Sequence, residues 1–99
     1  MVDVLQVVAE PRRRQILSLV WEHELAAGEI AGHFDMTFGA VSQHLAVLRG
    51  AGLVSVRRDG NRRFYTADKE ALGPLRPMLE AMWRDTLDRL ADSIEGQEP

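Results

Sequence analysis

The sequence predicts a mainly α-helical fold that carries one β-hairpin, and three observations lead to it. Residues 38 to 50 place Val41, Leu45 and Leu48 at 4,3 spacing, which is typical of a helix with one buried face. A cationic segment follows at once, in which two strand-like stretches flank a turn at Gly60. A shorter amphipathic helix is predicted just before residue 35. Together these parts make a winged helix-turn-helix, with five or six helices and a two-stranded wing.

Length and composition indicate a single domain, because 99 residues of which 45% are apolar supply one modest core. A core of that size favours further burial in an oligomer. The chain has no Cys, which excludes disulfides and thiolate metal sites and is compatible with a reducing cytosol. The N-terminus lacks the basic leader of a signal peptide, and no segment is long enough to cross a membrane. We therefore expect a cytoplasmic protein with no membrane partner.

Charge is distributed unevenly along the chain. Between Met36 and Thr66 five arginines stand against Asp59, a local charge of +4, and the net charge of −3 then leaves −7 for the rest. Such asymmetry lets one face approach DNA phosphates while the remaining surface repels them. The acidic balance of the whole chain is therefore no argument against a nucleic-acid partner.

The first two helices are predicted from apolar patterning and from a proline. Residues 4 to 8 are apolar nearly all round and are expected to be buried. The second helix begins at Pro11, where the missing N–H costs nothing. Its inner face consists of Ile16, Leu17, Val20 and Trp21. Residues 12 to 14 are arginines in its first turn, where they oppose the helix dipole. Two interpretations stay open for them, pairing with nearby acids such as Glu10 or contact with phosphate.

The next elements form the helix-turn-helix and the wing. A third helix is predicted over residues 25 to 34, with Leu25, Ile30 and Phe34 facing inward. The following helix, about 38–50, begins after Thr37, whose hydroxyl can accept a backbone N–H as a cap. Glycines at positions 50 and 52 end this helix. The wing is then expected over about residues 53–67.

A long helix is predicted over about residues 75–95. Its apolar face consists of Leu79, Met82, Trp83, Leu87, Leu90 and Ile94, and the last four of these step 4,3,4 as in a coiled coil. In so small a domain we expect such a long stripe to pack partly on a second copy of the chain. The alternative is an ordinary core helix. Its acidic outer face contains no His and is interpreted as solvated surface.

The helix over 38–50 presents an uncharged polar face, which suits the major groove of DNA because each base pair there shows a distinct pattern of donors and acceptors. Ser42 and Gln43 are the expected readers, since an amide can donate and accept at once, as adenine requires. Gly39 lets the helix N-terminus approach a phosphate. Two interpretations stay open for Phe38, contact with a thymine methyl or packing on its own helix.

His44 and the wing arginines are the candidates for contact with the DNA backbone. His44 either makes this contact or is a half-buried side chain packed on the preceding helix. At the wing tip, Asn61 and Arg62 are better placed for the minor groove than Arg57 and Arg58 at the base. The arginines at the base can instead pair with acids.

Four motifs stand in a recognisable order and spacing. They are EPRRRQIL (residues 10–17), AVSQHLAVLR (40–49), AGLV (51–54) and RRDGNRRFY (57–65). With them, the chain resembles the ArsR-type (arsenic-repressor-like) winged-helix transcriptional regulators. The resemblance runs from about Asp3 to Ile94, almost the entire chain.

This resemblance implies a homodimeric repressor that blocks a promoter. The first and last helices would form the dimer interface, at Val4, Leu5, Val8, Met82, Trp83, Leu87, Leu90 and Ile94. Two recognition helices would read successive major grooves of an inverted repeat in double-stranded DNA. The expected DNA contacts are Thr37, Phe38, Gly39, Ser42, Gln43, His44, Arg49, Asn61, Arg62 and Arg63.

Two departures from the family concern its effectors. Many relatives sense thiophilic metals through a pair of cysteines in the segment that matches residues 24–30, where this chain has Ala26 and Gly28. Others bind zinc or a similar ion through Asp and His on the last helix, but residues 75–95 contain no His. We therefore expect no metal site and no cofactor. The chain resembles the metal-independent branch, whose members act constitutively or answer to an organic ligand or a partner protein.

An enzyme is not expected, because the chain has no Cys, no Gly-rich phosphate loop and no regular ligand spacing among His23, His33 and His44. The rival interpretation is a winged-helix module for protein contact or dimerisation without DNA binding, since fold does not imply function. Such a module has no need for an uncharged polar reading face beside four wing arginines, and this sequence has both. A sequence-specific DNA-binding transcriptional regulator is the preferred interpretation.

Overall fold

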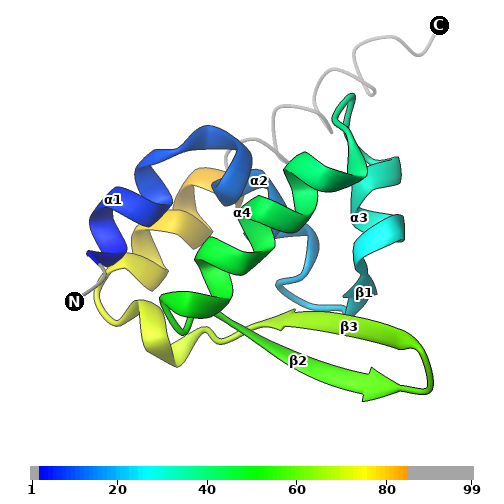
Figure 1. The fold of residues 1–99 in the computed structure, drawn as a ribbon. Helices are drawn as coiled ribbons and strands as arrows, with labels where there is room; N and C mark the ends of the chain where they lie inside the picture. Colours follow the sequence, from blue (N-terminus) through cyan, green and yellow to red (C-terminus); the bar gives the residue numbers. More distant parts are fainter. Residues whose placement is uncertain (1–2, 85–99) are drawn as a thin grey trace, which may run out of the picture.

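Helices gather on one side of a small antiparallel sheet in the computed structural model, which describes residues 3–84 (Figure 1). In chain order the elements are α1 (Val4–Ala9), α2 (Pro11–Leu19), β1 (Leu25–Ala26), α3 (Ala27–Gly32), α4 (Phe38–Gly50), β2 (Val54–Asp59), β3 (Arg62–Ala67) and a 3₁₀ turn, η1 (Glu70–Leu72). Residues 75–84 form a further helix. The mainly helical fold with one hairpin that the sequence predicts is confirmed.

The wing is a hairpin to which a third strand is added. β2 and β3 pair antiparallel and are joined by a two-residue turn at residues 60–61. Gly60 has a φ of 62°, which the first position of such a turn requires and which a residue with a Cβ rarely adopts. β1 pairs with β3 through Leu25 and Tyr65, so that the strand order is β1-β3-β2. The expected two-stranded wing is therefore part of a three-stranded sheet.

The third helix is shorter than the predicted range of 25 to 34. Leu25 and Ala26 are extended, because their backbone pairs with β3, and α3 begins only at Ala27. Glu29 supports this start, since its side chain accepts the N–H of Ala26 at 3.0 Å. Ile30 is fully buried as expected, whereas Leu25 and Phe34 are only partly buried.

Arginine side chains hold α2 against the end of α1. Arg13 donates from Nε to the carbonyl of Val7 at 2.8 Å. Arg14 donates from Nη1 to the carbonyls of Val8 and Ala9 at 2.8 and 2.9 Å. The last carbonyls of a helix have no partner within it, so these guanidinium groups cap α1 and complement its dipole. The structure thus gives both arginines a role that neither of the sequence-based interpretations included.

The core is built around the inner face of α4. Val41, Leu45 and Leu48 are exposed by 0, 1 and 0%, and the predicted stripe is confirmed. Side chains from α2, α3 and the start of the hairpin pack with them, namely Ile16, Leu17, Val20, Ile30 and Leu53. Burial of one face leaves the opposite face of α4 in solvent, next to the wing.

Both ends of α4 are closed by local hydrogen bonds. At the start, the hydroxyl of Thr37 accepts the N–H of Ala40 at 3.1 Å, as predicted for a cap. At the end, Gly52 has a φ of 77°, and the N–H of Leu53 donates to the carbonyl of Leu48 at 2.9 Å. This turn sends the chain directly from α4 into the wing.

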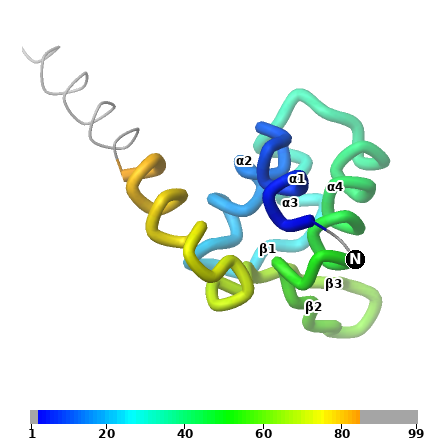
Figure 2. Tube along the Cα trace, turned by 90° about the vertical axis from the view of Figure 1, so that its left-hand side faces the viewer, coloured from blue at the N-terminus to red at the C-terminus, as the bar shows by residue number. Residues whose placement is uncertain are grey.

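The helix over 75–84 leaves the body on the side away from α4 (Figure 2). Leu79 anchors it in the core with 6% exposure. The rings of Trp21 and Trp83 meet edge to face with 4.8 Å between centroids, and Nε1 of Trp21 donates to Glu80 at 3.2 Å. Three members of the predicted stripe, Leu87, Leu90 and Ile94, lie outside the described residues.

Neither a membrane span nor a metal-binding cluster occurs within residues 3–84. No helix in this range is long and apolar enough to pass through a bilayer. No three or more His, Asp or Glu side chains in the same range come together in a group that could hold a metal ion.

We expect Leu48→Ala to lower the free energy of unfolding by about 2–5 kcal/mol, because it leaves a cavity at a fully buried position. Val47→Ala on the same helix, at a position exposed by 39%, should cost about 1 kcal/mol or less. Urea denaturation of both variants and the wild type at one protomer concentration measures the difference. Equal effects of the two substitutions would contradict the central place of this face of α4 in the core.

Candidate nucleic-acid interface

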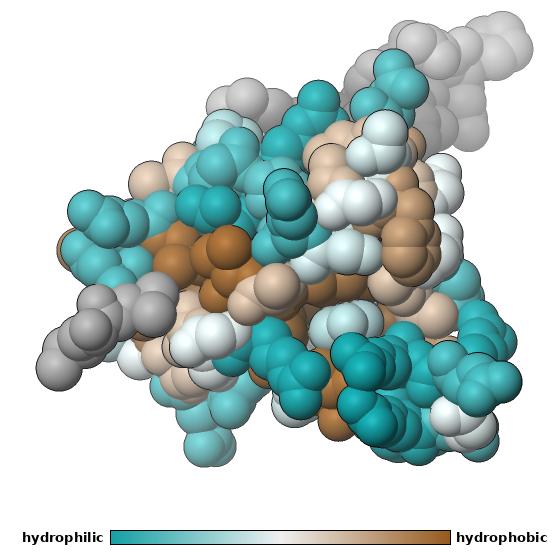
Figure 3. Space-filling view, in the orientation of Figure 1, coloured by the Kyte–Doolittle hydropathy of each residue, from teal (hydrophilic) through white to brown (hydrophobic). Residues whose placement is uncertain are grey.

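The exposed side of α4 and the wing lie on the same part of the surface, where hydrophilic residues gather over the hairpin (Figure 3). Gln43 and Arg49 are exposed, and Ser42 is half-buried. Phe38, in the first turn of the helix, is exposed by 59% and is therefore not buried against its own helix. The predicted reading face of α4 thus carries one cation and several uncharged side chains.

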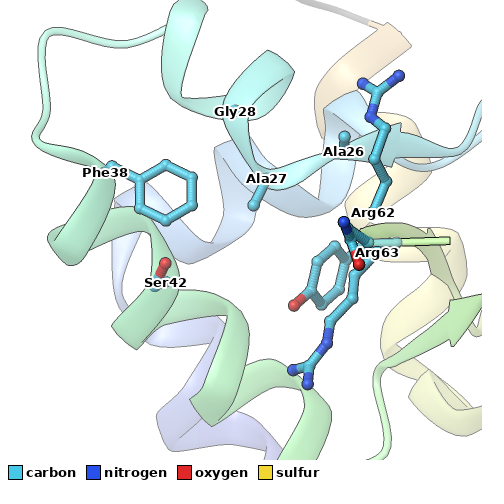
Figure 4. Close-up of a pocket in the computed structure, with 9 residues that line it drawn as sticks. Ala26, Ala27, Gly28, Phe38, Ser42, Arg62 and Arg63 are labelled. Atoms are coloured by element: carbon cyan, nitrogen blue, oxygen red, sulfur yellow. The ribbon is translucent and has the colours of Figure 1, made fainter. Parts of the chain in front are cut away.

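Two adjoining hollows separate α4 from the wing. The first, of about 340 Å³, lies between Phe38 and Ser42 of α4, the start of α3, and the tip of β3 (Figure 4). The second, of about 510 Å³, continues along α4 past Arg49. Ser42, Arg63 and Tyr65 line both hollows. They form one groove, the α4–wing groove, whose wall on α4 is uncharged except for Arg49 and whose wall on the hairpin is cationic.

The two faces of the wing carry different arginines. Side chains alternate between the faces of a strand, and residues paired across two strands share a face. Arg58 and Arg63 are paired across the hairpin and lie on the same face as the buried Tyr65, which is the inner face. Arg57 and Arg62 lie on the outer face. Figure 4 shows Arg62 and Arg63 pointing in opposite directions, with Arg63 directed toward α4.

On the outer face, each arginine is held by a carboxylate and by the ring of Phe64. Arg57 donates from Nε to both carboxylate oxygens of Glu24, at 3.0 and 3.1 Å, and lies 4.7 Å from the ring centroid. Arg62 lies 5.0 Å from the same centroid and donates from Nη2 to Glu29 at 3.4 Å. The expectation that an arginine at the wing base pairs with an acid is confirmed for Arg57.

The Glu24–Arg57 contact also changes the acidity of both groups. Hydrogen bonds from Arg57 hold the pKa of the Glu24 carboxyl below its ordinary value, and the same bonds raise the pKa of Arg57. Both side chains are about half exposed, so solvent screens the pair and its net contribution to stability is modest.

The inner-face arginines of the wing and Arg49 of α4 have no such partners in the part of the chain that the structure describes. Within residues 3–84, none of the ion pairs involves Arg49, Arg58 or Arg63. The carboxylates of Glu24 and Glu29 lie with the outer arginines. On the wing, the positive charge that no carboxylate within this range neutralises therefore lies on the inner face.

Two other predicted DNA contacts are engaged within the chain itself. His44 is half-buried, as in the packed interpretation, but its Nδ1 lies 3.9 Å from Glu10 at the start of α2, which is not the preceding helix. The hydroxyl of Thr37 is the cap of α4. Asn61 is exposed in the turn of the wing, and Gly39 is exposed in the first turn of α4.

The predicted dimer-interface residues divide by exposure. Leu5 and Met82 are exposed by 60% and 41%. Val4 and Trp83 are half-buried, and Val8 is exposed by only 7% because it packs in the core of its own chain. Among the described members of this set, Leu5 and Met82 therefore offer a second copy of the chain the most apolar surface to cover.

Sequence reasoning did not identify the acidic partners that hold the outer face of the wing. The pairs Arg57–Glu24 and Arg62–Glu29 each join residues 33 positions apart, and β1, which brings the two acids beside the hairpin, is too short to recognise from its pattern. The sequence did contain a signal that predicts how the arginines divide between the two faces of the wing. A two-residue turn at 60–61 sets the register, which pairs Arg58 with Arg63.

The sequence matches the family described as "Bacterial regulatory protein, arsR family" over residues 10–56. Three curated relatives are similar over most of the chain. The HTH-type transcriptional regulator Rv2034 of Mycobacterium tuberculosis is 38% identical over 93% of this chain and 86% of its own length. The transcriptional activator HlyU of Vibrio cholerae is 34% identical over 83% and 76%. The transcriptional repressor SdpR of Bacillus subtilis is 33% identical over 71% and 78%.

Solved structures agree with these matches. The crystal structure of a possible transcriptional regulator for arsenical resistance superposes with a TM-score of 0.72 at 42% identity, covering 94% of this chain and 97% of that one. The solution structure of the homodimeric winged helix-turn-helix DNA-binding domain of Mb0332 from Mycobacterium bovis gives a TM-score of 0.69 at 31% identity, covering 81% and 74%.

We expect the stability contributed by the Glu24–Arg57 pair to depend on pH. Because the pKa of Glu24 is lowered in the folded chain, the contribution is complete above the ordinary carboxyl pKa of about 4.3 and is lost as pH falls through the lowered value. Glu24→Gln should lower the melting temperature near pH 7, and the difference from the wild type should shrink between about pH 5 and about pH 3.

The matched control for this pH series is Glu70→Gln, because the Glu70 carboxylate makes no ion pair with any residue from 3 to 84. Its melting temperature should follow that of the wild type across the series. A Glu24→Gln deficit that stays constant down to about pH 3 would contradict the ionic origin of the effect.

Proposed function

The chain belongs to the ArsR family of winged-helix transcriptional regulators, and from that premise we propose that it binds an inverted-repeat operator as a homodimer and represses transcription from the promoter that the operator overlaps. The observation that carries this proposal is the α4–wing groove, where the exposed polar side of α4 faces Arg63 of the wing, which has no acidic partner in the described range. Such a helix can read the base edges of a DNA duplex while the cations of the groove neutralise its phosphates.

In the proposed complex α4 enters the major groove. The helix has 13 residues, about 20 Å, and the major groove is about 12 Å wide, so one exposed face reaches several base pairs. Gln43 is fully available for bidentate contact with adenine, and Ser42 sits deeper at the groove wall. The exposed ring of Phe38 supports its assignment to a thymine methyl group. Arg49 in the last turn supplies a cation for the adjacent phosphates.

The dimer is proposed from apolar side chains that are exposed on the first and the last described helices. Leu5 of α1 and Met82 of the last helix expose apolar side chains that a domain of this size has reason to bury. The related Mb0332 domain is homodimeric. To read successive major grooves, the two α4 helices of such a dimer must lie about 34 Å apart, one turn of B-DNA, and the two-fold symmetry of the dimer calls for an operator with inverted-repeat symmetry.

The direction of regulation is proposed from steric exclusion. Dimers that cover an operator keep RNA polymerase from an overlapping promoter, and the relative SdpR is a repressor. The relative HlyU is an activator, so the test must measure transcription as well as binding. We propose that this regulation needs no metal, because the chain has no Cys and holds Ala26 and Gly28 in the segment where metal-sensing relatives carry theirs. Because the protein would act on DNA, we place it in the cytoplasm.

The test is equilibrium binding to the duplex upstream of the protein's own gene and to a shuffled duplex of the same composition, each across a salt series, followed by transcription in vitro from that promoter. A preference for the native duplex that survives at physiological salt, with reduced transcript, is the expected result. Lack of binding to any duplex even at low salt would contradict a DNA-binding function and favour the protein-contact module.

Gln43→Ala should weaken binding to the native duplex by about 1–3 kcal/mol, because it removes the bidentate hydrogen bonds to one base. Binding to the shuffled duplex should change little, since phosphate contacts dominate there. Fluorescence anisotropy with a set of single base-pair substitutions should locate the reduced preference at one position in each half-site. Equal weakening on both duplexes would remove Gln43 from the reading residues.

Leu5→Glu should shift the protein from dimer toward monomer, because a carboxylate at the proposed interface must be desolvated to associate. The side chain is exposed by 60% in the single chain, so the helical circular dichroism of the monomer should be kept. Sedimentation equilibrium measures the mass, and Leu5→Met, which keeps the apolar surface, is the matched control. An unchanged dimer in Leu5→Glu would exclude α1 from the interface.

A further inference from the structure

We propose that the wing binds DNA through Arg58 and Arg63 on its inner face, and that Arg57 and Arg62 on its outer face serve instead to tether the wing to the segment that begins at Glu24. This inference rests on the proposed DNA-binding function and refines it. The sequence analysis expected DNA contacts from both Arg62 and Arg63, with Arg62 at the wing tip toward the minor groove; the proposal retains Arg63, adds Arg58 and removes Arg62.

The first argument is where a DNA strand must run. When a helix lies in the major groove and a wing reaches the adjacent minor groove, the two elements straddle the sugar–phosphate strand that separates those grooves. Here the space between them is the α4–wing groove, formed by the two hollows of about 340 and 510 Å³. Arg63 lines both hollows, and Ser42 and Arg49 border them from α4. A phosphate in this groove therefore meets Arg63 from the wing side.

The second argument is an unfavourable contact that an anion would relieve. Arg58 and Arg63 stand directly opposite each other across the hairpin, and like charges in that relation are destabilising. No carboxylate between residues 3 and 84 forms an ion pair with either guanidinium. A phosphate placed between the two arginines would satisfy both at once, with the charge-assisted geometry that guanidinium groups favour.

The third argument is that the outer arginines are already neutralised. Arg57 is bound to Glu24, and both Arg57 and Arg62 stack on the ring of Phe64. Arg62 borders the α3 end of the first hollow, but its guanidinium turns away to Glu29. To contact a phosphate, either arginine would have to give up a carboxylate and an aromatic contact, so the net number of counterions released from DNA would be small.

Glu29 gives this outer cluster a second attachment. One oxygen, Oε1, accepts the N–H of Ala26 at 3.0 Å and also the guanidinium of Arg62 at 3.4 Å. The same carboxylate therefore supports the start of α3 and holds the wing. Such a link helps to hold the wing against the start of α3, on the side where the first hollow of the α4–wing groove lies.

The experiment measures the slope of log K against log salt concentration on the shuffled duplex, by fluorescence anisotropy, for the full-length wild type and for Arg58→Ala, Arg63→Ala and Arg62→Ala. Arg58→Ala and Arg63→Ala should each reduce the slope by about 0.9 for every phosphate that the variant no longer neutralises, about 1.8 for a dimer. Arg62→Ala should leave the slope unchanged. Arg63→Lys, which keeps the charge, should restore most of the slope.

Thermal melting is a second readout, because it distinguishes an arginine that binds DNA from one that stabilises the fold. Arg63→Ala removes a like-charge pair and should leave the melting temperature unchanged or raise it, whereas Arg57→Ala should lower it. A reduced slope in Arg62→Ala with a wild-type slope in Arg63→Ala would overturn the inference and leave the proposed function standing. A wild type that binds no duplex at low salt would overturn the proposed function and this inference together.

Discussion

Burial of one face of α4 is the constraint on which the rest of this structure depends. A helix whose inner stripe is wholly covered by α2, α3 and the start of β2 can move neither along its axis nor around it without opening the core. Its opposite face is thereby held in solvent at a fixed orientation. Because the turn at Gly52 leads straight into β2, the same burial also positions the wing. Stability and the geometry of the candidate interface thus come from one set of apolar contacts.

Electrostatics explains how an acidic chain can present a surface for DNA. The carboxylates of Glu24 and Glu29 are close to the wing but bind the arginines of its outer face, and no acid from residue 3 to 84 is paired with the arginines of the inner face. The charge of the wing is consequently divided by strand alternation, with neutral pairs outside and free cations inside. A count of arginines along the sequence overestimates the charge that DNA meets, because such a count ignores which face each side chain occupies.

The remaining arginines of the chain illustrate how position changes the role of a residue type. In the first turn of α2, Arg13 and Arg14 oppose the dipole of their own helix, yet they close the C-terminus of α1, where cations are favourable. The sharp junction between α1 and α2 makes this possible, since it brings the last carbonyls of one helix beside the first turn of the next. These arginines therefore hold α1, an element of the proposed dimer interface, against the body of the chain.

By itself the sequence determined the periodic features of this protein. The stripe Val41, Leu45 and Leu48, the Thr37 cap, the start of α2 at Pro11 and the hairpin turn at Gly60 all follow from local patterns, and so do the family and the exposed reading face. Local patterns suffice there because helix and strand periodicity and backbone conformation depend on residues a few positions apart.

Only the tertiary structure decided the contacts between distant segments. It converted Leu25 and Ala26 from helix to strand and brought Glu24 and Glu29 to the outer face of the wing. Each of these outcomes depends on which backbone or side chain arrives from another part of the chain. No spacing within a single segment specifies that partner, and for this reason only the assembled fold could show that Arg62 has a carboxylate partner and Arg63 has none among residues 3–84.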